Sequence, residues 1–390
     1  MVRKILYLAP DVLISGSHGG SSHVIEATKS LAKLGNKVYL LCRSNFFNFK
    51  REGNLRFIGL PIADVAGLRL LSYIFYTIIV VIFSLLFLNI DIVYERGRIF
   101  GGFGVLLAKL FGRKSVYEFN EPYISLLLIN NRIDKNSLYF RMIKDLHDKV
   151  IKSSTINTVT HKNMRSDAGN RFKIVWWGTN PDIFKPDIKC DDIIKRYNLA
   201  KGKTFLYTGS YSEWHSCEVM IETIKELIKH DKEIKLLMIG RGKKLNLCKK
   251  LVRENNLESN VIFIDKIDNK DMPKFINASD FCFALFDRDY KPFKKFSFFY
   301  SPIKIHEYKA CGKPVIASDF GNLRDLVKNR INGVLVNEKD ADSVIKGIRT
   351  LMENKSLVKK IEENNRKEVL MKYNWDVINK MVLKELDIVH

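Results

Sequence analysis

Short apolar runs alternate with amphipathic stretches along the first half of the chain. Runs rich in Val, Ile, Leu and Tyr are typical of strands that are buried on both faces. They are "KILYLA" (4–9), "KVYLLC" (37–42), "DIVYE" (91–95) and "KSVYEF" (114–119). Between the first two, residues 21–35 carry apolar positions at helical spacing and end in a glycine suited to a helix C-terminus. This alternation predicts a parallel sheet with helices on both faces.

The same alternation restarts near residue 203. The strand-like runs there are "KTFLYTG" (203–209), "KLLMIGRG" (235–242), "NVIFID" (260–265), "DFCFALF" (280–286), "KPVIAS" (313–318) and "NGVLV" (332–336). Turn-forming residues and two prolines gather between the halves, at 176–190. The sequence therefore predicts two Rossmann-like, doubly wound α/β domains facing each other across a cleft, with ligands at the carboxyl ends of the strands. We expect them at 1–180 and 181–373, with a C-terminal helix at 374–390 packing back on the first.

An apolar segment interrupts the first half. Residues 70–90, "LLSYIFYTIIVVIFSLLFLNI", contain no charged side chain and are long enough to cross a bilayer. A membrane span would separate the first strands from the rest of their sheet, which argues against it. A buried core helix is a second alternative, but its apolar residues lie all round, more than one buried face requires. We favour a helix that enters the membrane interface.

The net charge of the chain bears on which partner this apolar segment could meet. The chain of 390 residues has 65 Lys and Arg against 43 Asp and Glu, a formal charge of +22. Such an excess suits an anionic partner, either a membrane surface, nucleic acid or a phosphorylated substrate, although a Lys-rich solvated surface also explains it. We see no nucleic-acid-binding motif. From the charge we expect an anionic membrane surface as a partner and no nucleic acid, and the oligomeric state stays open.

Cysteine usage and the N-terminus indicate the compartment. The six cysteines are scattered, without a CxxC pair or a cluster with histidine, which argues against a disulfide framework or a zinc site. The first apolar run is too short for a signal peptide and is better interpreted as a strand. We therefore predict a cytoplasmic protein, peripheral on the inner face of the cell membrane.

The stretch 299–322, "FYSPIKIHEYKACGKPVIASDFGN", carries the clearest chemistry. Ser301 suits the N-cap and Pro302 the first position of a helix, and Gly312 suits its end. The free N–H groups of a first helical turn bind phosphate, and Lys304 would add a charge there. Glu307 lies on the same face and suits vicinal sugar hydroxyls. This predicts a nucleoside diphosphate, although spacing alone is equally typical of a surface Lys–Glu pair.

The segment 301–318, "SPIKIHEYKACGKPVIAS", resembles the motif of the family 4 retaining glycosyltransferases, which have the GT-B fold. Other stretches, including 175–186 and 207–222, also resemble the family, and they occur in the same order as in the family over nearly the whole chain. In that family, the glutamate at the position of Glu307 binds the donor ribose. The wider family often has a second glutamate where this chain has Phe299. His215 stands where a lysine is more usual, which places more of the diphosphate grip on Lys304.

The resemblance implies roles for further residues. The expected catalytic residues are Arg96, Asn120 and Lys304. The expected donor-binding residues are Gly20, Gly209, Ser210, His215, Arg288, Ser301, Ile303, Lys304 and Glu307. The expected acceptor-binding residues are His18, Gly19 and Glu121. No metal-ligand cluster is visible, so we expect no metal or other cofactor, with helix termini and basic side chains stabilising the leaving phosphate.

These observations predict a retaining glycosyltransferase of the hexosyltransferase type. It would move a sugar from a nucleotide-diphosphate sugar to a hydroxyl of a glycan or lipid-linked acceptor at the cytoplasmic membrane face. A nucleotide-sugar epimerase of the same fold is one alternative. A non-catalytic protein that binds anionic lipid, nucleotide or nucleic acid is another, motivated by the charge and by Phe299. The base, the sugar, the acceptor and the linkage do not follow from the sequence.

Overall fold

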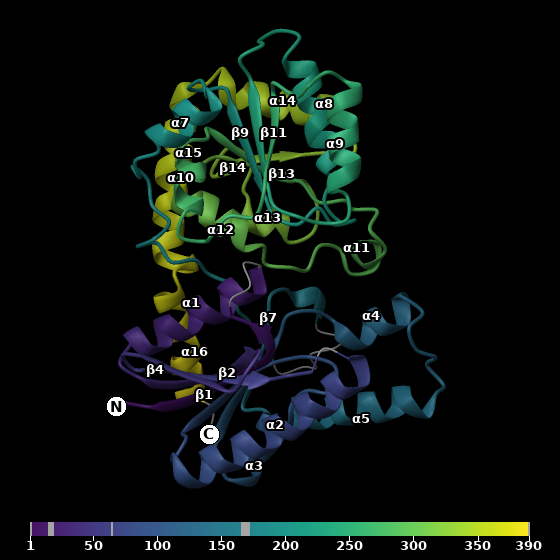
Figure 1. Cartoon of the computed structure of the whole chain (residues 1–390), viewed down its shortest axis with the longest axis vertical. Helices are drawn as coiled ribbons and strands as arrows, with labels where there is room; N and C mark the ends of the chain where they lie inside the picture. The colour runs from purple at the N-terminus through teal and green to yellow at the C-terminus, as the bar shows by residue number, and fades with distance from the viewer. Residues whose placement is uncertain (1, 15–18, 64, 165–171, 389–390) are drawn as a thin grey trace. The chain divides into compact units, whose positions relative to one another are not determined.

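The computed structural model describes residues 2–14, 19–63, 65–164 and 172–388. The chain forms two compact units. The first comprises Met1–Trp177, Phe299–Ser301 and Trp375–His390, and the second comprises Gly178–Phe298 and Pro302–Asn374. Each unit has a largely parallel sheet with helices on both of its faces, as Figure 1 shows, so the predicted α/β class is confirmed.

The sheet of the first unit has eight strands among the described residues, in the order β3-β4-β2-β1-β5-β6-β7-β8. They are β1 (Lys4–Leu13), β2 (Lys37–Ser44), β3 (Asn48–Glu52), β4 (Leu55–Pro61), β5 (Ile92–Arg96), β6 (Lys114–Phe119), β7 (Ile156–Val159) and β8 (Phe172–Ile174). Strand β3 runs antiparallel to β4, and the other pairs are parallel. The direction of winding reverses between β1 and β5, which makes this the topological switch point of the sheet.

Alternate residues of β1 enter two different cores. Ile5 and Tyr7 belong to the core on the side of α1 (Gly19–Lys33) and α16 (Trp375–Ile388). Leu6 and Leu8 belong to the core under α2 (Ala66–Phe87) and α3 (Phe103–Leu110). An ion pair of 2.6 Å between Arg3 and Asp387 anchors α16 beside β1. The remaining described helices of this unit are α4 (Tyr123–Ile129), α5 (Leu138–Ser153) and the 3-10 turn η1 (Lys162–Met164).

The sheet of the second unit has six parallel strands in the described part, ordered β11-β10-β9-β12-β13-β14. They are β9 (Thr204–Thr208), β10 (Lys235–Ile239), β11 (Val261–Ile264), β12 (Phe281–Ala284), β13 (Val315–Ser318) and β14 (Gly333–Val336). All six predicted strands are confirmed, because each is a local apolar run, and most of their residues are buried. The switch point lies between β9 and β12.

Helices cover both faces of this second sheet. They are α7 (Asp191–Tyr197), α8 (Cys217–Leu227), α9 (Leu245–Glu254), α10 (Met272–Asn277), α11 (Lys291–Phe296), α12 (Ile303–Ala310), α13 (Leu323–Leu326), α14 (Ala341–Met352), α15 (Lys355–Glu368) and the π-helical turn η2 (Val369–Tyr373). The predicted start of α12 is wrong in one respect. Pro302 is its N-cap, and the Ser301 hydroxyl instead accepts a hydrogen bond of 3.0 Å from the Trp177 N–H. Gly312 follows the helix with φ of +80°, as its predicted stop requires.

Four strands were missing from the prediction. Strand β3 is exposed at every position and contains Lys, Arg and Glu, so it has no apolar run to reveal it. Strand β4 pairs with it through a turn at Gly53, where φ is +57°. Strands β7 and β8 are short. Their pairing depends on neighbours far along the chain, which a local pattern does not contain.

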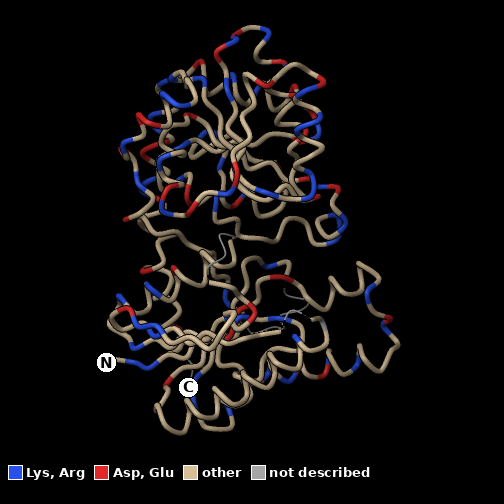
Figure 2. Tube along the Cα trace, in the orientation of Figure 1, with Lys and Arg blue, Asp and Glu red and all other residues tan. Residues whose placement is uncertain are grey.

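The apolar segment forms the long helix α2. Of the described helices, it is the one that is long and apolar enough to cross a membrane, and 28% of its most apolar window is buried. Tyr73, Val81 and Leu85 pack onto the sheet, whereas Leu71, Phe75 and Phe83 are more than half exposed. The alternative of a helix buried on all sides is therefore wrong. Figure 2 shows that no charged residue interrupts this helix after Arg69.

Candidate functional site

Both switch points carry groups that suit a polar ligand, and each is described within its own unit. In a doubly wound sheet, ligands bind outside the carboxyl ends of the strands at the point where the winding reverses. In the second unit this place is formed by the loop after β9 (209–216), the loop after β10 (240–244) and the start of α12. In the first unit it is formed by the ends of β1, β5 and β6.

Glycines bring the loops of the second unit close together. Gly209 has φ of +145°, and a Cβ atom there would lie 2.6 Å from the Lys304 Nζ. Gly240 has φ of +138°, and its Cβ would lie 2.0 Å from the Gly209 carbonyl oxygen. Gly242 likewise faces the backbone of Tyr211. Backbone therefore replaces side chains around Lys304. The Gly209 and Gly240 N–H groups donate to the Ile239 and Ile264 carbonyls, so an anion here would meet the Lys304 ammonium and the first turn of α12.

Of these glycines, only Gly209 had been predicted as a site residue. Gly240 and Gly242 stand in "IGRG", directly after an apolar strand. A glycine pair at the carboxyl end of a predicted strand was the signal that could have found them.

Lys304 is half-buried at the centre of this arrangement. Its Nζ lies 3.4 Å from the His215 Nε2 and 4.4 Å from the centroid of the Tyr207 ring. Burial lowers the pKa of Lys304 to about 8, and the nearby Cys217 and Glu307 oppose this shift. An ammonium whose pKa lies this close to 7, and which has few anionic neighbours, is well placed to bind a phosphate.

His215 does not supply a second cation. Burial, followed by the charges of Lys304 and Lys244, lowers the pKa of His215 well below its usual value. The imidazole is therefore neutral near pH 7, and it contacts Lys304 as a hydrogen-bonding partner. The role of Lys304 as the main cation for a diphosphate stays a prediction.

Glu307, Ile303 and Ser210 complete this half of the site. Glu307 is buried three residues after Lys304 and attracts its charge. Ile303 is buried in the first turn of α12, so its backbone N–H is the group it can offer. Ser210 is exposed beside Gly209, and its hydroxyl accepts a hydrogen bond of 2.8 Å from Ser212. Tyr308 ties α12 to the end of β9 through a bond of 2.9 Å from the Thr208 N–H to its hydroxyl.

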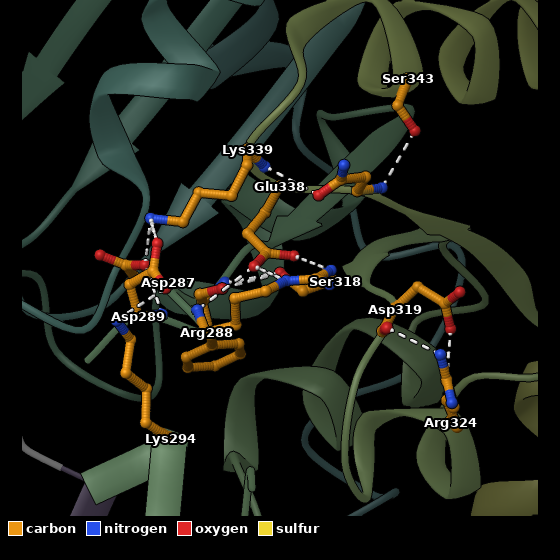
Figure 3. A network of polar contacts seen from close by, with 12 residues as sticks. Asp287, Arg288, Asp289, Lys294, Ser318, Asp319, Arg324, Glu338, Lys339 and Ser343 are labelled. Atoms are coloured by element: carbon orange, nitrogen blue, oxygen red, sulfur yellow. Dashed lines mark hydrogen bonds and ion pairs between the residues drawn. The ribbon is translucent and has the colours of Figure 1, made fainter. Parts of the chain in front are cut away.

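Two predicted donor residues are engaged elsewhere. The guanidinium of Arg288 makes a two-pronged pair with Glu338, with Nε–Oε1 and Nη2–Oε2 distances of 2.7 and 3.0 Å. Figure 3 shows this pair inside a wider ionic network that includes Lys339. The Glu338 side chain is completely buried, so Arg288 neutralises it. The Ser301 hydroxyl accepts the hydrogen bond from the Trp177 N–H that is described above.

The first unit presents a buried ionic cluster at its switch point. The Glu118 carboxylate lies 2.8 Å from the His23 Nε2 and accepts a hydrogen bond of 2.9 Å from the Tyr7 hydroxyl. Burial by itself would raise the pKa of Glu118, but His23 and then Arg96 lower it below its usual value. For His23 the effect of burial is the opposite: it lowers the pKa, and the attraction of Glu118 only partly offsets this. The cluster therefore combines an ionised carboxylate with the cation Arg96.

Sequence reasoning missed His23, Glu118 and Tyr7. A charged residue inside the apolar run "KSVYEF" was the available signal for Glu118. His23 lies on the inner face of α1, where its ring packs 4.4 Å from that of Trp177 and 4.9 Å from that of Trp375.

The predicted residues Arg96, Asn120 and Glu121 surround this cluster. Arg96 ends β5, and Asn120 and Glu121 follow β6. Burial would lower the pKa of Arg96, yet Glu118, Tyr123 and Asp11 raise it. Burial raises the pKa of Glu121, against the effects of Arg96 and of Tyr300, whose hydroxyl lies 3.4 Å from its Oε2.

Several buried polar atoms here have no hydrogen-bond partner among the described residues. They are the Nη1 of Arg96, the Oδ1 of Asn120, the Oδ1 of Asp11 and the Nε1 of Trp177. Buried polar atoms nearly always find a partner, in protein, water or ligand. A ligand rich in hydroxyl groups would satisfy both the donors and the acceptors of this set.

Gly19, which was predicted to bind the acceptor, and Gly20, which was predicted to bind the donor, form the first turn of α1. His18 lies outside the described residues. In the described part of the chain, no three His, Cys, Asp or Glu side chains come together in a way that could hold a metal ion.

Comparison with known proteins identifies the class. Residues 191–368 match the family model described as "Glycosyl transferases group 1". An uncharacterized glycosyltransferase of Methanocaldococcus jannaschii is 25% identical over 96% of this chain and 96% of its own length. A second one from the same organism is 24% identical over 54% of this chain, and the match spans 52% of that relative. The phosphatidyl-myo-inositol mannosyltransferase of Mycobacterium leprae is 21% identical over 64% of this chain and 62% of its own.

Solved structures confirm the predicted fold. Sucrose-phosphate synthase from Thermosynechococcus elongatus has a TM-score of 0.75 at 16% identity, covering all of both chains. HepE from Anabaena, in a complex with UDP-glucose, has a TM-score of 0.71 at 16% identity, covering 99% of each chain. The chain has the GT-B fold of two Rossmann-like domains, and its second half is similar to the glycosyl transferases group 1. It is a glycosyltransferase, as the sequence predicted.

Proposed function

We propose that this protein is a retaining glycosyltransferase that uses a nucleotide-diphosphate sugar as donor. The observation that carries the proposal is the half-buried Lys304 ammonium, which lies against the Gly209 loop at the start of α12. Such a cation, next to the first turn of α12, offers charge and backbone N–H groups to a diphosphate. Glu307, on the same face of α12, suits the ribose hydroxyls. The complex of HepE with UDP-glucose supports a donor of this chemical class.

The proposed reaction exchanges one bond at the anomeric carbon for another on the same face of the sugar. The bond from this carbon to the diphosphate oxygen breaks, and a bond to the acceptor oxygen forms. The proton of the acceptor hydroxyl moves to the departing phosphate oxygen. Lys304 and the N–H groups of α12 stabilise the negative charge that develops on the phosphate. This route uses neither a protein nucleophile nor a metal ion, and we propose that the enzyme works without either.

The buried cluster of the first unit suits the acceptor. Arg96 and Asn120 hold unsatisfied polar atoms of both kinds, a donor and an acceptor, which match the two hydrogen-bonding functions of a hydroxyl. We propose that they bind the sugar being transferred or the acceptor hydroxyl, and that Glu121 assists in orienting the acceptor. This cluster also contains Glu118, whose ionised carboxylate favours hydroxyl donors.

We place the reaction at the cytoplasmic face of the membrane, on a glycan or lipid-linked acceptor. The mycobacterial relative is named for a phosphatidyl-myo-inositol acceptor, which supports a lipid. The formal charge of +22 favours an anionic surface. The exposed apolar side chains of α2 would find a more favourable environment in the membrane interface than in water.

The first experiment is a thermal-shift screen with UDP, GDP, ADP, CMP and their common sugars. At about 100 times its dissociation constant, a ligand should stabilise the folded protein by about 2.7 kcal/mol. We expect one base to give a clear shift that Glu307→Gln loses. Glu222→Gln, at an exposed glutamate of α8, should keep the shift. If no nucleotide stabilises the protein, the proposal is wrong and a non-catalytic role gains support. Interconversion of the sugar nucleotide without an acceptor would instead indicate an epimerase.

A further inference from the structure

The distribution of polar and apolar residues on helix α2 is the reverse of that on an ordinary surface helix. Its outward residues are Leu68, Leu71, Phe75, Ile79, Phe83 and Leu86, spaced three or four apart, and their exposed fractions range from 47% to 65%. Its inward face includes Tyr73, Thr77 and Ser84, which are at most 1% exposed. A helix that faces water on its outer side carries polar residues there. The outer face of α2 is therefore suited to a hydrocarbon environment.

A cleft runs between this outer face and the β3–β4 hairpin. Its volume is about 470 Å³, within the range of small-molecule sites, about 300–1,000 Å³. Apolar side chains from both sides line it, among them Phe47, Phe49, Phe57, Ile79 and Phe83. Phe47 contacts Tyr76 of α2 edge to face at 5.6 Å between ring centroids, which links the two sides. The lining thus offers little except apolar surface.

The charged residues of the lining are all cations. They are Lys50, Arg51 and Arg56, and the described lining contains no Asp or Glu. Lys50 pairs with Glu52 at 2.6 Å, outside the lining, and Arg56 donates to the Tyr39 hydroxyl at 2.8 Å. Arg51 donates its Nε–H to the Gly53 carbonyl at 3.2 Å, so its two Nη groups can still reach an anion. An apolar cleft with a basic rim complements a molecule with a hydrocarbon chain and an anionic head.

We propose that the cleft between α2 and the β3–β4 hairpin binds the hydrocarbon chain of a membrane lipid whose phosphate is held by Arg51 and its basic neighbours. The apolar stripe of α2 would then lie against the bilayer from which the chain enters. A bound peptide is less well matched, because the apolar lining would leave most of its backbone groups without partners. The proposal deepens the membrane-bound acceptor proposed above, but the binding itself requires no glycosyl transfer.

The test measures the binding of n-dodecyl phosphate, below its critical micelle concentration, by isothermal titration calorimetry. We expect saturable binding with one molecule per chain. n-Dodecyl maltoside, with the same chain and an uncharged head, should bind about fivefold or more weakly, since it lacks a charge-assisted contact. Inorganic phosphate alone should not bind measurably at this cleft, because it lacks the chain.

Matched variants on one helix locate the site. Phe83 lines the cleft and Phe75 does not, yet their exposed fractions are similar, 54% and 59%. Phe83→Ser should weaken the binding of n-dodecyl phosphate about fivefold or more, whereas Phe75→Ser should change it less than about twofold. Arg51→Gln should weaken n-dodecyl phosphate but leave n-dodecyl maltoside unchanged. Circular dichroism should show that all three variants are folded.

Two results would overturn the proposal. One is the absence of saturable n-dodecyl phosphate binding to the wild-type protein. The other is an equal loss in Phe83→Ser and Phe75→Ser, which would indicate a general apolar surface. Nucleotide thermal shifts, measured on the same samples, separate this proposal from the proposed function: lipid binding without nucleotide binding would contradict only the function, and the reverse only the cleft.

Discussion

The two switch points of the molecule have the same strand order around them but opposite chemistry. In the second unit, Gly209 and Gly240 bring backbone close to one half-buried cation, Lys304. In the first unit, a buried network of His23, Glu118 and Arg96 occupies the corresponding edge. The same architecture thus positions two different kinds of site.

The difference matches what the two proposed ligands would require. A diphosphate carries concentrated charge, and closely approaching N–H groups with a single ammonium match it irrespective of the sugar attached. An acceptor is recognised by its hydroxyl groups, which need donors and acceptors at defined positions. We therefore expect variants of the second unit to change nucleotide affinity, and variants of the first to change turnover with the nucleotide still bound.

The largest effect should come from Lys304→Met. Without the ammonium, the leaving phosphate loses its main cationic partner, and kcat/KM should fall about 10²–10³-fold. Nucleotide affinity should fall with it. Release of nucleoside diphosphate in the presence of acceptor measures both quantities. Lys295→Met, at a cation of α11, is the control and should retain activity. A Lys304→Met enzyme within twofold of wild type would contradict the assignment.

Arg96→Gln should have the next largest effect, in the opposite unit. It removes the positive charge that helps to keep Glu118 ionised. It also removes the Nη1 group, which has no hydrogen-bond partner among the described residues. We expect kcat to fall about 10²-fold, with the nucleotide dissociation constant within about twofold of wild type. Arg113→Gln, at a surface arginine bonded to Asn89, serves as the matched control. An equal loss of nucleotide affinity would remove the contrast between the units.

Gly209→Ala should weaken nucleotide binding about 30-fold. The added Cβ would lie 2.6 Å from the Lys304 Nζ, so the ammonium would have to move. Gly202→Ala separates this effect from backbone strain, because Gly202 also has a positive φ, +80°, but has open space around it. Gly202→Ala should lower the free energy of unfolding by about 1 kcal/mol and leave nucleotide affinity nearly unchanged. Similar affinities in the two variants would show that Lys304 does not need this close approach.

The smallest effect we predict is a pH dependence confined to the second unit. The pKa of Lys304 is about 8 in the free protein, and phosphate binding favours the protonated form. The dissociation constant of the nucleoside diphosphate should therefore rise about tenfold between pH 7 and pH 9. His215 is already neutral over this range and should not contribute. Lys304→Arg, which stays charged, should give a flat profile, and titration calorimetry at several pH values makes the comparison.

The sequence by itself determined the parts that depend on local order. The buried parallel strands are visible because each is a continuous apolar run, and Lys304 and Glu307 share a face because helical spacing requires it. The order of strands and glycines was then enough to place Gly209 at a carboxyl end. The exact start of α12 could not be predicted, because Ser301 bonds to Trp177, far away in the sequence.

Only the tertiary structure decided which polar groups meet. Tyr7 and Glu118 are 111 residues apart, and Arg288 and Glu338 are 50 apart, so no local pattern connects them. The structure also decided which face of the apolar helix α2 is buried, since apolar residues lie all round it and its polar residues turn inward. A side chain buried among distant segments has its charge set by those neighbours, and they become neighbours only when the chain folds.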